Sequence, residues 1–94
     1  MYSVYILYSP KADRFYIGQS EDVNARIDMH KQKCFTGSFT SFTDDWGLFL
    51  EIRCSSRTQA ILIERHIKRM KSRKYLGDLK KYPEIANKLK EKYL

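Results

Sequence analysis

Two short runs of aromatic and β-branched residues near the N-terminus constrain the fold of this 94-residue chain most strongly. The runs are MYSVYILY (residues 1–8) and FYIGQ (residues 15–19). Residues of these types favour strands, and each run is too short for a stable helix. Between the runs, Pro10 and Asp13 are typical of a turn. The sequence therefore predicts an antiparallel hairpin at the start of the chain.

The short turn also suggests how the two strands pair. A register that sets Leu7 opposite Tyr16 also sets Tyr5 opposite Gly18. Side chains alternate between the faces of a sheet, so these four residues would share one face. A shift of one residue would move all of them to the other face.

The rest of the sequence predicts one further strand and four helices. The strand covers residues 46–53, and the helices cover residues 20–32, 56–71, 72–81 and 83–94. Ser20 and Ser56 are the predicted N-caps of the first two helices, and Gln59 completes a capping box with Ser56. Residues 33–45 form a long loop, a type of segment that often carries function. We expect a single α+β domain over residues 1–94, with a core of about residues 2–80. It would hold a small three-stranded antiparallel sheet flanked by helices, in the order β-β-α-β-α-α-α.

Two of the predicted helices place polar side chains beside an apolar stripe. In the first, Val23, Ile27 and His30 share one stripe, and Arg26 borders it. In the second, Glu64 borders an apolar face made of Ala60, Ile63, Ile67 and Met70. Each polar residue has an ordinary structural explanation: Arg26 could extend to water, His30 could be a hydrogen-bonded core residue, and Glu64 could pair with Arg65 or Lys68.

The charge of +7 is concentrated in the C-terminal third of the chain. Residues 1–64 hold seven basic and eight acidic residues, whereas residues 65–94 hold eleven basic and three acidic ones. A basic region on a nearly neutral body indicates a polyanionic partner, although a solvated pair of helices would have the same composition. Cys34 and Cys54 fit no metal-binding spacing. They could form one disulfide, but two buried thiols are the favoured interpretation. The sequence lacks a leader peptide and a run long enough for a membrane span, so we expect a soluble cytoplasmic protein with no membrane partner.

The triplets SVY (residues 3–5) and YIG (residues 16–18) resemble the paired signature of the GIY-YIG nuclease superfamily. The first triplet is degenerate and the second is intact. Arg26 follows the second triplet by eight residues, and His30 lies four residues later, where the family carries an Arg and then a His or Tyr. Glu64 lies in the helix after the third strand, where the family has its metal-binding Glu. The resemblance covers about residues 2–80 and is closest to the small stand-alone members. It extends to the N-terminal nuclease domain of the bacterial nucleotide excision repair subunit.

The resemblance implies hydrolysis of a nucleic-acid phosphodiester with one Mg²⁺ or Mn²⁺ ion held by Glu64. It implies that Arg26 binds the phosphate oxygens and that Tyr5 activates or orients the attacking water. Tyr16 and His30 would complete the hydrogen-bond network, with His30 as a candidate for passing a proton. Which of these three accepts the proton stays open. Many members also have a late supporting Asn. Asn87 is the only Asn after Glu64 in this chain, and it lies too far along.

The same resemblance makes nucleic acid the expected partner, and it favours DNA over RNA, in repair or recombination. Five basic residues would contact the phosphate backbone, namely Lys68, Arg69, Lys71, Arg73 and Lys74. Gly18 would let a ligand approach closely, next to a helix N-terminus suited to phosphate. A binding module of the same fold without activity, or a protein that docks an acidic partner, are the alternatives. The sequence does not indicate an oligomeric state.

Overall fold

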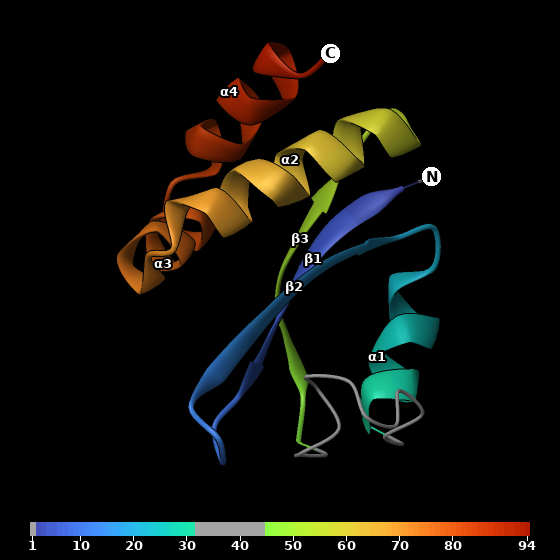
Figure 1. Ribbon diagram of the computed structural model, residues 1–94, viewed down its shortest axis with the longest axis vertical. Coiled ribbons are helices and arrows are strands. Elements are labelled where there is room, and N and C mark those ends of the chain that lie inside the picture. The colour runs from blue at the N-terminus through green and yellow to red at the C-terminus, as the bar shows by residue number, and fades with distance from the viewer. Residues whose placement is uncertain (1, 32–44) are drawn as a thin grey trace.

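The computed structural model describes residues 2–31 and 45–94. The elements are β1 (Ser3–Ser9), β2 (Arg14–Ser20), α1 (Val23–Lys31), β3 (Gly47–Arg53), α2 (Arg57–Met70), α3 (Arg73–Lys81) and α4 (Pro83–Lys92). The strands form one antiparallel sheet in the order β2-β1-β3. Helix α1 lies on one side of this sheet, and α2, α3 and α4 lie on the other (Figure 1). The α+β fold and the predicted order of the elements are therefore confirmed.

The register of the hairpin is also confirmed. Leu7 pairs with Tyr16, and Tyr5 pairs with Gly18. The pairing of β1 with β3 shifts register between Ile6 and Leu7. Strand β1 is thus the central strand, and alternate residues of it face two separate hydrophobic cores.

The larger core lies between the sheet and helices α2, α3 and α4. Its fully buried members include Val4 and Ile6 from β1 and Ile63 and Ile67 from α2. The prediction that Met70 belongs to the same apolar face is wrong, because 45% of Met70 is exposed. Met70 is the last residue of α2, and the chain turns away directly after it through Lys71 in a left-handed conformation (φ 47°).

The smaller core lies between the sheet and α1. Tyr5 and Leu7 from β1 pack there with Val23 and the fully buried Trp46. His30 is only 2% exposed, so the predicted stripe on this helix does face the sheet. This smaller core brings polar aromatic side chains into the interior.

The N-cap of α1 differs from the prediction. Oδ1 of Asp22 accepts a hydrogen bond from the backbone N–H of Ala25 at 3.1 Å, so Asp22 caps the helix. Ser20 instead accepts from the backbone N–H of Asp22 at 3.1 Å and closes the turn before the helix. Strand β2 extends to Ser20, whereas Asp22 directly precedes the first residue of α1 and can therefore cap the helix.

The N-cap of α2 is confirmed at Ser56, whose hydroxyl accepts from the backbone N–H of Gln59 at 3.1 Å. The return bond of the capping box is displaced by one residue, because Oε1 of Gln59 accepts from the backbone N–H of Ser55 at 2.7 Å. The buried amide nitrogen of Gln59 donates to the carbonyl of Lys90 at 2.9 Å. This bond fastens α4 to α2.

Some predictions fall outside the described residues, namely those on Cys34 and on residues 33–44 of the long loop. Cys54 is a buried free thiol, as expected, and burial raises its pKa. Among the helices that the structure describes, none combines the length and apolar character that a membrane crossing requires.

Candidate active site

Two phenols and an imidazole meet on the α1 side of the sheet. The hydroxyl of Tyr5 lies 3.3 Å from Nε2 of His30, within hydrogen-bond distance. The ring of Tyr16 is 4.7 Å from that of His30 and 6.1 Å from that of Tyr5, measured between centroids. Tyr5 and His30 are each 2% exposed, whereas Tyr16 is half-buried. Tyr16 is therefore the outer member of this aromatic cluster, and Tyr5 and His30 are the inner ones.

Gly18 makes room for this cluster. A Cβ atom at this position would lie 2.7 Å from the hydroxyl oxygen of Tyr5 and 3.1 Å from a ring carbon of Tyr16. Only glycine lets the phenol of Tyr5 lie across the strand here. The space beside Gly18 is thus filled by Tyr5, and the approach of a nucleic acid at this glycine stays a prediction. The neighbouring helix N-terminus is already capped by the carboxylate of Asp22, which opposes phosphate binding there.

The charges of Arg26 and Glu64 both act on Tyr5. Burial raises the pKa of Tyr5 far above its ordinary value, and coupling to Tyr16 and the negative charge of Glu64 raise it too. The positive charge of Arg26 lowers this pKa. Tyr5 belongs to the α1 side of the sheet and Glu64 to α2 on the other side, and β2 is an edge strand. Arg26 and Glu64 therefore both lie near enough to Tyr5 for their charges to act on its hydroxyl, although Glu64 belongs to the opposite side of the sheet.

His30 is neutral at pH 7 because burial and the positive charge of Arg26 both lower its pKa. A neutral imidazole has one ring nitrogen that can accept a proton. Tyr5, by contrast, stays protonated across the physiological range. The pair thus holds a hydroxyl donor beside a nitrogen suited to accept from it.

Glu64 is the acidic member of the site, and its side chain is 19% exposed. The ammonium of Lys68 lies 3.3 Å from Oε2 of Glu64, so the predicted local ion pair is formed, with Lys68 and not Arg65 as the partner. Within residues 2–31 and 45–94, no three Asp, Glu, His or Cys side chains gather as a metal-binding cluster. A single hard carboxylate that already attracts a cation fits Mg²⁺, which keeps several waters and needs few protein ligands.

The basic residues assigned to nucleic-acid binding lie in two different environments. Lys68, Lys71 and Arg73 line a hollow between β2 and the end of α2. Arg69 and Lys74 are exposed and do not line it. Arg73 forms an ion pair with Asp13 at 3.0 Å, a contact across 60 residues for which the sequence gives no signal.

The chain matches the model of one protein family over most of its length. A model described as the GIY-YIG catalytic domain matches residues 1–76. The chain belongs to the GIY-YIG family. Its fold is therefore of the nuclease type, and nuclease domains of this family act on nucleic acids. No curated protein and no solved structure gives a significant match. The resemblance to the stand-alone branch and to the excision repair subunit stays a prediction.

Proposed function

We propose that this GIY-YIG domain is a metal-dependent endonuclease that hydrolyses phosphodiester bonds in DNA, with repair or recombination in the cytoplasm as its setting. The cluster of Tyr5, Tyr16 and His30, with the charges of Arg26 and Glu64 acting on Tyr5, supports this proposal. The packing of a small domain does not require a phenol and an imidazole to be buried together within the influence of two opposite charges. An enzyme that attacks a phosphate needs those groups together.

Arg26 would bind the scissile phosphate. Its guanidinium presents several N–H donors in one plane, which matches the non-bridging oxygens that carry most of the charge in the transition state. A phosphate bound there would also offset the positive charge that lowers the pKa of His30. Substrate binding would therefore make His30 a better proton acceptor.

Glu64 would hold the Mg²⁺ or Mn²⁺ ion in place of its present partner, Lys68. When bound, the ion supplies positive charge to the phosphate and to the leaving oxygen. Lys68, once released from Glu64, would remain close to the site as a phosphate contact. The carboxylate of Glu64 would thus exchange the ammonium of Lys68 for the metal ion.

The aromatic cluster would remove the proton of the attacking water. The half-buried Tyr16 would receive it, and each phenol would pass on its own proton until Nε2 of His30 holds one. Both phenols then end neutral and His30 ends as an imidazolium. The water oxygen forms a bond to phosphorus while the bond to the leaving oxygen breaks, and the leaving oxygen takes a proton from solvent. The order follows burial, with Tyr16 outside and His30 inside.

A binding module without turnover is the second candidate. It is favoured by one observation, that Asn87 lies on α4 beside β3, in a hollow that contains none of the proposed catalytic residues. The supporting Asn found in many family members thus has no equivalent after Glu64.

The decisive experiment incubates labelled single-stranded, duplex and branched DNA, with matched RNA, in Mg²⁺ or Mn²⁺. Wild type is compared with Glu64→Ala and with Glu91→Ala, an exposed carboxylate on α4 that serves as the control. We expect cleavage by wild type and by the control, and no cleavage but retained binding by Glu64→Ala. Wild-type binding without cleavage on any substrate would establish the binding module instead.

A further inference from the structure

A groove runs from the active site along the outer edge of β2. Its larger part is a hollow of about 400 Å³ between β2, the end of α2 and the start of α3. Its smaller part, of about 330 Å³, includes Tyr16 of the aromatic cluster. Phe15, Ile17 and Lys68 line both parts, so the two form one groove that opens on the active site.

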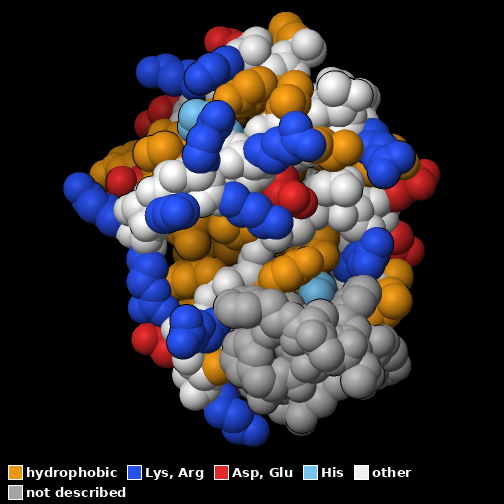
Figure 2. Space-filling view, viewed as in Figure 1, with side chains coloured by type: hydrophobic (Ala, Val, Ile, Leu, Met, Phe, Trp, Pro, Cys, Tyr) orange, Lys and Arg blue, Asp and Glu red, His pale blue; other side chains and the backbone are white. Residues whose placement is uncertain are grey.

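The groove has an apolar floor and a basic rim. Phe15, Ile17, Ile67 and Leu76 form the floor. The rim carries Arg14, Lys68, Lys71 and Arg73, and Asp13 is the one carboxylate of the lining. Figure 2 shows hydrophobic side chains in the hollow between α2 and the hairpin, with Lys and Arg side chains around them. This combination suits a ligand with a flat apolar part and a negatively charged backbone.

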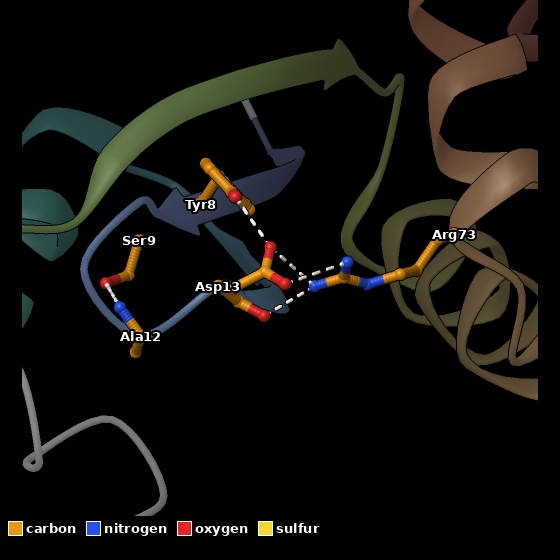
Figure 3. Close-up of polar contacts among 5 residues, drawn as sticks. All are labelled: Tyr8, Ser9, Ala12, Asp13 and Arg73. Atoms are coloured by element: carbon orange, nitrogen blue, oxygen red, sulfur yellow. Dashed lines mark hydrogen bonds and ion pairs between the residues drawn. The ribbon is translucent and has the colours of Figure 1, made fainter.

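The far end of the groove is closed by a network between the hairpin turn and α3. Asp13 accepts a hydrogen bond from the hydroxyl of Tyr8 at 2.7 Å and pairs with the guanidinium of Arg73 (Figure 3). The same guanidinium also donates to the backbone carbonyl of Asp13 and lies 5.3 Å from the centre of the Phe15 ring. Because Asp13 offsets the charge of Arg73 and Glu64 pairs with Lys68, the rim cations without an ion pair among the described residues are Arg14 and Lys71.

We infer that this groove holds an unpaired nucleotide next to the scissile phosphate, so that the substrate class is DNA with unpaired nucleotides at the cleavage point. The position relative to the scissile bond rests on the proposed function. In a duplex, the faces of the bases are stacked on one another and cannot reach an apolar floor. An unpaired base can lie on an aromatic side chain, while Lys and Arg follow its backbone. The volume is in the range of small-molecule sites and has room for a nucleotide but not for a duplex.

Binding measurements without cleavage test this inference. Wild-type protein in EDTA is titrated with a labelled 15-nucleotide single strand, with the same sequence as a blunt duplex, and with that duplex carrying a three-nucleotide flap. We expect the single strand and the flap to bind about tenfold more tightly than the duplex, within the range that one base stack provides. Equal affinity for all three would overturn the inference.

Three variants locate the binding in the groove. Lys71→Glu should weaken flap binding by about tenfold, whereas the control Lys88→Glu, an exposed residue of α4, should weaken it no more than twofold. Phe15→Leu keeps an apolar side chain and removes the aromatic face. It should abolish the fluorescence quenching of 2-aminopurine placed in the flap. Equal losses for the two Lys variants, or quenching that persists in Phe15→Leu, would show that the groove is not the site.

These outcomes are separate from those of the cleavage assay. If the flap preference and the variant effects are found but Mg²⁺ produces no cleavage, the groove stands and the proposed catalytic function fails. If cleavage occurs on duplex and flap alike with no effect of Lys71→Glu, the catalytic function stands and the groove inference fails.

Discussion

The two faces of the sheet are built from alternate residues of the same strand, yet they differ in what they bury. On the α2 side, β1 contributes Val4 and Ile6 to a core of aliphatic side chains. On the α1 side, it contributes Tyr5 and Leu7 to a core that also holds an indole and an imidazole. Because the side chains of β1 alternate between the two faces of the sheet, this one strand contributes both to the stabilising core and to the candidate active site.

The α2 side carries most of the stabilising structure. Three helices pack there, and the part of the chain beyond the family match, residues 77–94, lies on this side. The hydroxyl of Tyr93 near the C-terminus bonds Nδ1 of His66 at 3.0 Å, and Gln59 bonds the carbonyl of Lys90. The helix outside the matched region thus reinforces the larger core and leaves the active site untouched.

The α1 side buries polar groups whose transfer from water is costly unless they are hydrogen-bonded. The contact of 3.3 Å between the Tyr5 hydroxyl and Nε2 of His30 contributes to meeting that requirement. The larger core can therefore stabilise the domain while the α1 side of the sheet holds the polar groups of the candidate active site. Substitutions on the two faces should therefore separate stability from activity, and the following changes test that separation.

The largest expected loss of stability comes from Ile63→Ala. Ile63 is fully buried in the larger core, and such a truncation typically costs about 2–5 kcal/mol because it leaves a cavity. Urea denaturation should show this loss, while kcat per folded molecule changes less than twofold. A kcat that falls in proportion to stability would mean that the two faces are not separable.

The largest expected loss of activity at nearly constant stability comes from Arg26→Ala. Removing one group that stabilises a developing anion costs about 3–4 kcal/mol of transition-state stabilisation. Arg26 is only partly buried, so the melting temperature should change little. Steady-state kinetics and thermal denaturation of the same preparation test this. A steep fall in melting temperature with activity retained would assign Arg26 to structure instead.

Much of the fold could be predicted because its signals are local. The hairpin register followed from the short turn between the two strands, and the cap at Ser56 followed from a hydroxyl three residues before Gln59. The position of Asp22 as the cap of α1 was missed because Ser20 and Asp22 are both good capping residues. Only the path of the chain out of β2 distinguishes them.

The candidate site was harder to predict because its geometry is not local. Each of its residues has an ordinary structural reading on its own, and the family spacing alone brought them together. The space that Gly18 provides and the ion pair between Asp13 and Arg73 depend on which side chains meet across the fold. Contacts between residues far apart in the sequence leave no periodic pattern in it, so only the structure shows them.

An intermediate effect on both properties is expected for Gly18→Ala. The new methyl group would lie under 3 Å from the hydroxyl of Tyr5, so the phenol must shift away from His30. Overpacking of this kind costs about 1–3 kcal/mol of stability, and the shift should lower kcat by more than tenfold. Gly47→Ala is the control, because its Cβ would meet nothing within 4 Å. Similar effects of the two variants would show that Gly18 is not needed for space.

The smallest expected effect on stability is its dependence on pH. Because burial lowers the pKa of His30, this residue binds a proton more readily in the unfolded chain than in the folded one as the pH falls. The stability from this residue is complete above the unfolded pKa of about 6.5 and is lost as the pH falls toward the folded pKa. His66 shifts in the same direction, so the melting temperature of His66→Gln is compared at pH 7 and pH 5 to isolate the part due to His30.

Activity should follow the same titration if His30 accepts the proton. Below its folded pKa, kcat/KM should fall about tenfold per pH unit, and above it the profile should be flat up to pH 9. If Tyr5 acted directly as a phenolate, the raised pKa of Tyr5 would instead make the rate climb about tenfold per unit throughout this range. The two profiles therefore differ above the folded pKa of His30, where the first is flat and the second still rises. His30→Asn should remove the acid limb only under the first scheme, because Asn has no proton to gain or lose in this range.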